Sequence, residues 1–135
     1  MAENENFFKK LVNTPDHTAE FEQSDIEANK AMGILSYIGI LVLIPIFAAK
    51  GSKYARFHAN QGLVLLIADA ATGIAVSVTR KILGLISWVL NLTLGGLLST
   101  VVYLAIAGLV VFGIIFAAKG KAKELPLIGK FRILK

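Results

Sequence analysis

Residues 82–118 read ILGLISWVLNLTLGGLLSTVVYLAIAGLVVFGIIFAA, a run of 37 positions without a charged side chain. As one straight α-helix this run would be about 55 Å long, at roughly 1.5 Å per residue, whereas the hydrocarbon core of a bilayer is about 30 Å thick. The run therefore has to break. The adjacent glycines within NLTLGG, residues 91–96, predict the break because glycine weakens a helix. We expect a short segment over 82–94 and a full span over 97–118.

The composition of the whole chain agrees with a membrane protein. Of its 135 residues, 56% are hydrophobic and 17% are charged, against about 25% charged in a typical soluble domain. Only six charged side chains lie between Ala31 and Ala118. Too few polar groups are present to cover that apolar surface in water, so we expect an integral membrane protein. There is no cysteine, which excludes disulfides and thiolate metal sites.

Two further apolar stretches precede the long run. Residues 31–49 would form a helix of about 28 Å, which matches a bilayer core. A second stretch over 62–79 is interrupted only by Asp69, and Arg80 with Lys81 would mark a membrane boundary. The sequence thus predicts an all-α integral membrane bundle of four transmembrane or partly re-entrant helices, with three crossings as the alternative.

Charge divides the chain into three parts. Residues 1–24 are polar and predict a flexible N-terminal segment, residues 25–118 the membrane bundle, and residues 119–135 a basic juxtamembrane tail. Ser24 and Glu27 fit a capping box at the start of the bundle. A basic tail beside a span favours contact with anionic lipid headgroups. The tail residues expected to make those contacts are Lys119, Lys121, Lys123, Lys130 and Arg132.

The positive-inside rule places the C-terminus but not the N-terminus. With either three or four crossings, nine Lys and Arg near the spans lie on the side of the tail and three on the other. Both alternatives therefore predict a cytoplasmic C-terminus in a multi-pass protein of the plasma membrane. No folded basic module with interleaved aromatic residues is present, so nucleic acid is not an expected partner.

The stretch YARFHANQGLVLLIADAATG, residues 54–73, carries the most informative polar residues. At helical spacing it forms a polar stripe with Asp69 in its middle. One interpretation is a path for an ion, a proton or a substrate. The other is structural: Asp69 would bond to Ser36, Tyr37 or Tyr103. For Arg56 and His58 the functional alternative is binding of a phosphate headgroup or an acidic partner, and the structural one is that they reach the interface and set the depth of the helix. The candidate functional residues of this stripe are Arg56, His58, Asn60, Gln61, Asp69 and Thr72.

Nothing in the sequence indicates catalysis. The two histidines, His17 and His58, stand in unrelated contexts, and no serine lies near a histidine and an acid in a nucleophile pattern. Glycine-rich phosphate loops are also lacking. We therefore expect a protein that is not an enzyme and that carries no cofactor or metal.

Three stretches together resemble a known family: KYARFHANQGLVLLI (residues 53–67), residues 25–50, and KGKAKELPLIGKFRILK (residues 119–135). They resemble small bacterial membrane proteins related to the twenty-kilodalton component of the chloroplast inner-envelope protein import machinery. The resemblance implies four membrane helices with both termini on the cytoplasmic side and, for the plastid relatives, a part in protein translocation. Its signature falls on Arg56, Phe57, His58, Asn60 and Gln61, and implies no catalytic role for them.

These observations predict a non-enzymatic membrane component that acts in assembly or in association with translocation. Its expected partners are the bilayer with its anionic lipids and other membrane proteins or further copies of itself. The alternative is a small transporter or channel subunit for an ion, a proton or a solute that uses the stripe around Asp69.

The hexapeptide IFAAKG occurs twice, over residues 46–51 and 115–120. Each copy ends an apolar stretch with a lysine, followed by a glycine that can take the left-handed cap. With three crossings the two copies share a membrane side, and with four they lie on opposite sides. The position of Lys50 relative to Lys119 therefore tests the topology.

Overall fold

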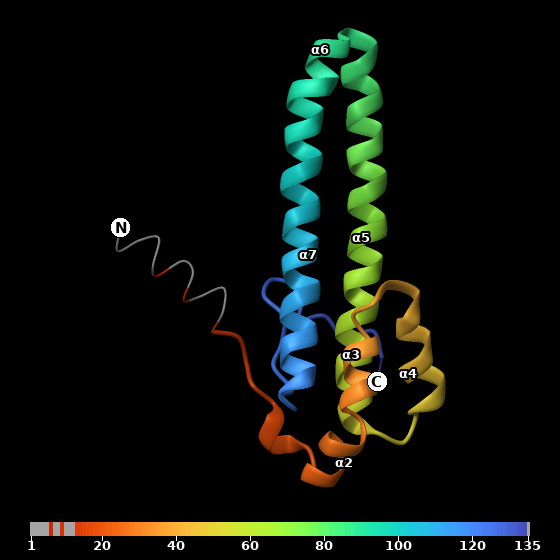
Figure 1. Cartoon of the computed structure of the whole chain (residues 1–135), viewed down its shortest axis with the longest axis vertical. Coiled ribbons are helices and arrows are strands. Elements are labelled where there is room, and N and C mark those ends of the chain that lie inside the picture. The colour runs from red at the N-terminus through yellow and green to blue at the C-terminus, as the bar shows by residue number, and fades with distance from the viewer. Residues whose placement is uncertain (1–5, 7–8, 10–12, 135) are drawn as a thin grey trace.

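The computed structural model describes residues 6, 9 and 13–134, and in these residues it is all-α apart from one isolated backbone bridge. Two long antiparallel helices dominate it (Figure 1). The first is α5, Lys53–Ile86, and the second is the continuous run Trp88–Ala118. Both are long and apolar enough to cross a membrane. The prediction of an all-α membrane protein is confirmed. We call these two helices the hairpin.

The hairpin turns at Ser87, not at the predicted break over residues 91–96. Ser87 has an extended backbone, with φ −163° and ψ 133°, and its hydroxyl accepts a hydrogen bond from the Val89 amide at 3.2 Å. This is the arrangement of an N-cap, which starts the next helix directly. The separate third segment predicted over 82–94 does not exist, because its first residues complete α5 and the others begin the returning helix.

The returning helix consists of α6, Trp88–Leu90, a π-helical turn, Asn91–Gly95, and α7, Gly96–Ala118. Gly95 lies within this helix and does not end it. A Cβ atom there would lie 2.9 Å from Asn91 Oδ1 and 3.4 Å from Arg80 Cγ. The glycine therefore serves close packing: it leaves room for Arg80, whose Nε donates to Asn91 Oδ1 at 3.1 Å. Arg80 does not end α5, which continues to Ile86.

The predicted first span over residues 31–49 is also broken. It consists of α3, Lys30–Leu35, a 3₁₀ turn, Gly39–Val42, and α4, Leu43–Ala48. Gly39 has φ +52°, a left-handed conformation that glycine adopts without strain, and the chain reverses there. Figure 1 shows α3 and α4 side by side near one end of the hairpin. The chain enters α3 and leaves α4 at the same end of the hairpin. The described residues therefore form neither three nor four full crossings.

One end of the hairpin carries the remaining structure. Residues 13–52, which include α2, Gln23–Ala28, and the tail residues 119–134 pack on it. We call this end the base. Its core has two clusters of buried side chains, one around Tyr54 and the other around Tyr37. The buried members are Ile26, Tyr54, Phe57 and Ala122 in the first, and Tyr37, Leu65, Ala117 and Leu125 in the second.

Glycines let α3 and the residues that follow it approach the hairpin closely. A Cβ atom on Gly62 would lie 1.7 Å from the Ser36 carbonyl oxygen, and one on Gly113 would lie 2.3 Å from the Tyr37 ring. Neither distance is possible for a real side chain, so only glycine fits at these two positions. Residues 36 and 37 are therefore seated directly on the backbones of α5 and α7.

The two copies of IFAAKG lie at the same end of the hairpin. The first leads into the start of α5, and the second ends α7. Gly120 has φ +72°, its amide bonds to Ala117 O at 3.1 Å, and the Lys121 amide bonds to Phe116 O at 2.8 Å. This is a Schellman cap, as predicted for the second copy. Gly51 does not take the left-handed conformation, so the two copies end their helices differently.

The α2 helix begins at Gln23, two residues earlier than a cap at Ser24 requires. Its N-cap is Glu22, without a side-chain capping bond, so the predicted capping box is wrong. Residues 13–21 lie against the tail, where the His17 amide donates to Ala122 O at 2.8 Å. The part of the segment 1–24 that the structure describes from residue 13 onward is therefore packed on the base.

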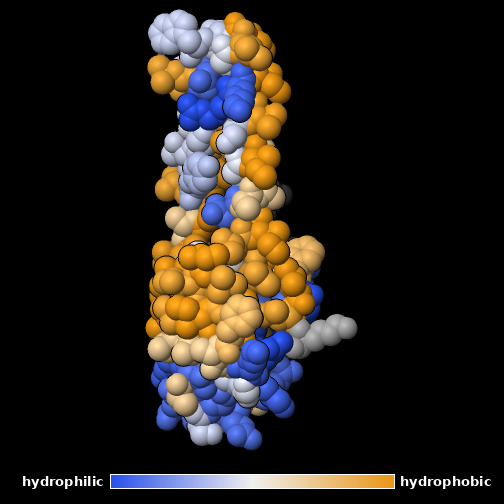
Figure 2. Space-filling model, turned by 90° about the vertical axis from the view of Figure 1, so that its right-hand side faces the viewer, coloured by the Kyte–Doolittle hydropathy of each residue, from blue (hydrophilic) through white to orange (hydrophobic). Residues whose placement is uncertain are grey.

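The surface shows where a bilayer fits. Figure 2 shows a broad hydrophobic belt with a hydrophilic zone below it at the base, and a hydrophilic patch toward the far end of the hairpin. Most of the hairpin is uncovered: only 22% and 11% of the most apolar stretches of its two helices are buried inside the protein. Such exposed apolar helices are stable in lipid, and the chain is a small membrane protein.

Candidate functional site

Two amides of the predicted stripe hold the tail. Asn60 Nδ2 donates to Phe131 O at 2.8 Å, while its Oδ1 accepts from the Ile133 and Leu134 amides at 2.6 and 2.9 Å. Gln61 Nε2 donates to Gly129 O and its Oε1 accepts from the Leu125 amide, both at 2.9 Å. Each side chain uses both its donor and its acceptor on main-chain groups, so the tail follows a fixed path along α5.

His58 completes this arrangement. Its Nε2 lies 3.0 Å from Lys121 O, and its Nδ1 lies 2.7 Å from the Tyr37 hydroxyl. A carbonyl can only accept, so Nε2 carries the proton and Nδ1 accepts from Tyr37. His58 is fully buried and joins the tail to the residues after α3. We call His58, Asn60 and Gln61, with the tail main chain that they bind, the polar clamp.

The start of α5 is fixed by a carboxylate from α2. Asp25 accepts from the Ser52 hydroxyl at 2.5 Å and from the Tyr54 amide at 3.0 Å, and Ser52 Oγ accepts from the Ala55 amide at 3.0 Å. A negative charge at a helix N-terminus is stabilising. The Tyr54 hydroxyl then donates to Ala117 O at 2.9 Å, which joins α5 to the end of α7.

The N-terminal segment is held on the tail by charge. His17 Nδ1 lies 2.7 Å from Glu20 and its Nε2 lies 2.9 Å from Glu124, which also accepts from Arg132 at 3.3 Å. Both ring nitrogens face carboxylates, so the doubly protonated ring fits best. The hydrogen bond to Glu124 is the main cause that raises the pKa of His17 above its usual 6.5.

We expect attachment of residues 13–21 to weaken as the pH rises. A pKa raised by folding means that the stabilisation is fully present below about pH 6.5 and is lost as the pH passes the raised value. Hydrogen–deuterium exchange at the His17 amide, corrected for the intrinsic pH dependence, measures this attachment. Protection should fall through that range in the wild type. The control His17→Gln should be less protected and should show no such step, and an identical step in both proteins would contradict the assignment.

Asp69 and Thr72 lie above the polar clamp and outside it. Thr72 Oγ1 donates to main-chain oxygens of its own helix, Ala68 O at 2.8 Å and Asp69 O at 3.1 Å. The half-buried Asp69 lines a small cavity of about 50 Å³ beside Tyr37. Two of the three predicted partners of Asp69 form other hydrogen bonds: Ser36 Oγ donates to Met32 O, and the Tyr37 hydroxyl donates to His58.

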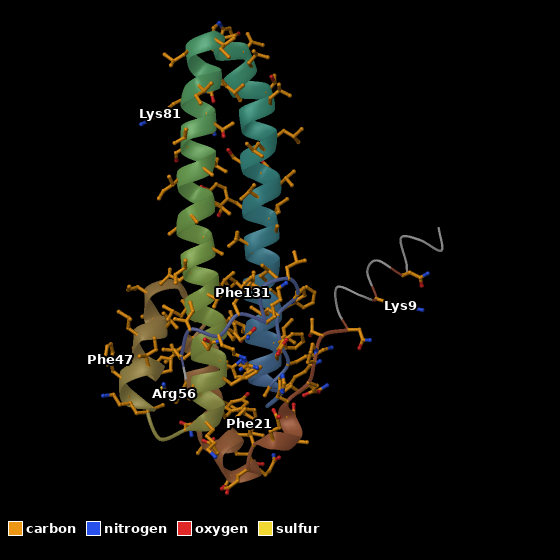
Figure 3. The ribbon with its side chains drawn as sticks, turned by 180° about the vertical axis from the view of Figure 1, so that it is seen from behind. Lys9, Phe21, Phe47, Arg56, Lys81 and Phe131 are labelled. Carbon is orange, nitrogen blue, oxygen red and sulfur yellow. The ribbon has the colours of Figure 1, made fainter. Side chains whose placement is uncertain are left out.

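The predicted lipid contacts are in part exposed at the base. Lys119, Lys121, Lys130 and Arg132 are exposed, and Lys123 is half-buried with its ammonium 5.5 Å from the Phe116 ring centre. Phe131 and Ile133, at 53% and 48% exposure, place apolar side chains beside these cations. Figure 3 shows Arg56 and Phe21 at the base and Phe131 higher along the hairpin.

The structure also uses residues that sequence reasoning did not single out. Tyr54 and Asp25 organise the start of α5, and Glu124 receives both His17 and Arg132. Glu124 is the one acid in the basic tail. A single acid among cations indicates a specific partner, and this pattern could have identified Glu124 from the sequence. The stripe of six candidate residues is divided by the fold: three form the polar clamp, and Arg56, Asp69 and Thr72 do not.

Comparison with known proteins identifies a relative in Paramagnetospirillum magneticum, the magnetosome protein MamF. The two chains are 32% identical over 100 residues, which covers 74% of this chain and 78% of the relative. No protein-family profile and no solved structure matches the chain. The resemblance to the chloroplast import component was therefore wrong. Most residues of its short signature hold the base together: Phe57 packs in the core, and His58, Asn60 and Gln61 form the polar clamp. Such a motif is weaker evidence than an alignment over most of the chain. The chain belongs to the family of the magnetosome protein MamF.

Proposed function

We propose that this protein is a non-enzymatic component of a magnetosome-type membrane, where it assembles with other membrane proteins or with further copies of itself. The membrane is suggested by the name of its relative MamF, which favours it over the plasma membrane. The hairpin anchors the protein in the bilayer, and the base lies on the cytoplasmic side among anionic headgroups. The observation that carries this proposal is the charge difference between the two ends of the hairpin.

Cations gather at the base. Between residues 13 and 134, nine Lys and Arg belong to the base and two, Arg80 and Lys81, belong to the far part of the hairpin. Basic residues near membrane spans favour the cytoplasmic side, so this ratio supports a cytoplasmic base with the tail on that side. The nine are Lys30, Lys50, Lys53, Arg56, Lys119, Lys121, Lys123, Lys130 and Arg132.

The exposed hairpin supports the assembly part of the proposal. Its outward side chains are large and apolar, for example Ile74 at 67% and Leu104 at 68% exposure. A pair of helices covers little of its own surface, and lipid or neighbouring membrane helices must cover the rest. The polar clamp fixes the tail on the base, because its amides bind the main chain of the tail. Most cationic side chains of the tail therefore remain exposed on the surface of the base.

The transport alternative has weaker support. It requires a continuous polar path around Asp69, but His58, Asn60 and Gln61 are occupied by the tail. The cavity beside Asp69 has a volume of about 50 Å³, which is room for only a water molecule or two. We therefore do not extend the proposal to transport.

Cysteine labelling tests the topology, because the chain contains no cysteine. Gly51→Cys at the base and Thr93→Cys at the turn both replace exposed residues. In sealed membrane vesicles we expect an impermeant maleimide to label Gly51→Cys from the cytoplasmic side and Thr93→Cys from the opposite side. Lys119→Cys reports the side on which the returning helix ends. The maleimide should label it from the cytoplasmic side, as it labels Gly51→Cys. Labelling of positions 51 and 119 from opposite sides would overturn the hairpin.

Oxidative cross-linking in the same membranes tests assembly. Leu104→Cys, on the exposed face of α7, should form a disulfide with a neighbouring copy or with another membrane protein. Val76→Cys is the matched control, because Val76 is buried at 6% exposure and should remain uncross-linked. A protein that stays monomeric in its native membrane, at Leu104 and at further exposed hairpin positions, would contradict the assembly role.

A further inference from the structure

We propose that the base binds a phosphate group, that of an anionic phospholipid, in a cavity between the start of α5 and the end of the tail. This inference rests on the proposed function, because it names a ligand for the side of the base that meets the membrane. The cavity has a volume of about 350 Å³. Its walls combine three cations, Lys53, Arg56 and Arg132, with three apolar side chains, Phe21, Phe57 and Leu134.

The cations come from two parts of the chain that the polar clamp brings together. Lys53 and Arg56 lie in the first turn of α5, whereas Arg132 lies in the tail. Asn60 binds the main chain on both sides of Arg132, at Phe131 O and at the Ile133 amide, and so fixes where Arg132 emerges. The site exists only while the tail is in place.

Arg132 is itself held in a defined orientation. Its guanidinium lies 5.4 Å from the Phe57 ring centre, and one of its nitrogens donates to Glu124 at 3.3 Å. A guanidinium has five N–H donors, so the bond to Glu124 leaves donors for a phosphate oxygen. Arginine placed in this way suits phosphate, which accepts two parallel N–H bonds.

The surroundings separate this cavity from a neighbouring one. Lys53 also borders a second cavity, of about 500 Å³, which has an acidic rim. The acidic rim repels an anion from this second cavity, whereas the three cations of the proposed cavity attract it. No acidic residue is among the described residues that line the cavity we propose. The acids of the neighbouring rim are Glu20, Glu22 and Asp25.

The depth of the cavity fits a phospholipid headgroup. The apolar part of α5 begins near Gly62, and Arg56 lies six residues before it, about 9 Å along the axis at roughly 1.5 Å per residue. The headgroup layer extends roughly 5–7 Å beyond the hydrocarbon on each side, and long cationic side chains reach toward it. Phe21, Phe57 and Leu134 supply apolar walls of a kind that glycerol and the first acyl carbons can contact.

Native mass spectrometry of the full chain, titrated with dioleoylphosphatidylglycerol in mild detergent, tests the site. The variant K53Q/R132Q removes two charges from the cavity, and the matched control K50Q/K81Q removes two exposed charges outside it. We expect the cavity variant to bind the lipid at least about tenfold more weakly, the effect of losing one charge-assisted contact, and the control to bind as the wild type does. Equal weakening in both variants, or no effect in either, would overturn the site.

Two further arms complete the experiment. Hydrogen–deuterium exchange of the Ile133 amide shows whether R132Q frees the tail. If it does, the lipid affinity of the single variant Lys53→Gln is the test instead, because Lys53 is exposed and its replacement should not disturb the fold. Inorganic phosphate added at millimolar concentration distinguishes the source: displacement of the lipid would assign the site to soluble phosphate and overturn the lipid, whereas no displacement supports the lipid. If labelling places the base in the cytoplasm while both double variants bind equally, the phosphate site fails and the proposed function stands.

Discussion

Replacing Gly62 with alanine is expected to detach α3 from the hairpin. We expect it to destabilise the base more than any other replacement of a glycine by alanine in this chain. The new Cβ would lie 1.7 Å from the Ser36 carbonyl oxygen and 2.6 Å from its carbon. Both are main-chain atoms, so no side-chain rotation relieves the contact and the backbone has to move. Overpacking of this kind costs about 3 kcal/mol, the upper end of the usual range.

The consequences of that movement reach the polar clamp. Ser36 precedes Tyr37, whose hydroxyl donates to His58, and His58 in turn holds Lys121 O. A displaced α3 therefore loosens the tail as well. Thermal unfolding in detergent and hydrogen–deuterium exchange across residues 30–37 and 121–134 measure both effects.

Gly108→Ala is the matched control for Gly62→Ala. A Cβ atom at Gly108 meets nothing within 4 Å, so the same change should leave the base intact. It should even stabilise α7 slightly, because alanine favours a helix over glycine by up to about 1 kcal/mol. If the two variants had the same unfolding temperature and exchange, the close seating of Ser36 on α5 would be wrong.

Gln61→Leu is the second change with a large expected effect. Gln61 is fully buried and serves the Leu125 amide and Gly129 O together. Leucine has a similar size but can serve neither group, and an unsatisfied buried main-chain group costs roughly 1–3 kcal/mol. With two such groups, the tail should detach in a large fraction of molecules. Exchange of the Leu125 amide should rise by at least about tenfold, which corresponds to 1.4 kcal/mol.

Thr72→Val is the control that separates the two interpretations of the stripe. Thr72 belongs to the same predicted stripe, but its hydroxyl donates only to oxygens of its own helix. Its loss should leave the exchange of the tail unchanged. An equal response to Gln61→Leu and Thr72→Val would show that the clamp does not hold the tail. The expected difference assigns His58, Asn60 and Gln61 to construction of the base.

The sequence by itself determined the class of this protein. A run of 37 uncharged residues cannot be covered in water, and this requires helices in a bilayer whatever the arrangement of their neighbours. The basic tail, the end of α7 at Ala118 and the Schellman cap at Gly120 were also local in origin. Such features depend on composition and on a few adjacent residues, so pattern reasoning reaches them.

The number and path of the helices were decided by tertiary structure. The pair Gly95–Gly96 predicted a break, but Gly95 accommodates Arg80 and Asn91, and the turn occurs at Ser87. Residues 31–49 had the length of a span, yet Gly39 reverses the chain so that Ser36 and Tyr37 can sit on Gly62 and Gly113. A glycine that bends a chain and a glycine that admits a neighbour look alike in sequence, because only the neighbour distinguishes them.

The same reason explains the site. His58, Asn60 and Gln61 were found from sequence as a polar stripe, because polar groups on an apolar helix need partners. Apart from the Tyr37 hydroxyl on His58, their partners are main-chain groups more than sixty residues away, which carry no side-chain signal. Sequence therefore located the residues, and only the fold showed that they bind the tail. It also brought Lys50 and Lys119 to one end of the hairpin, since a helical pair that returns on itself must place its two ends together.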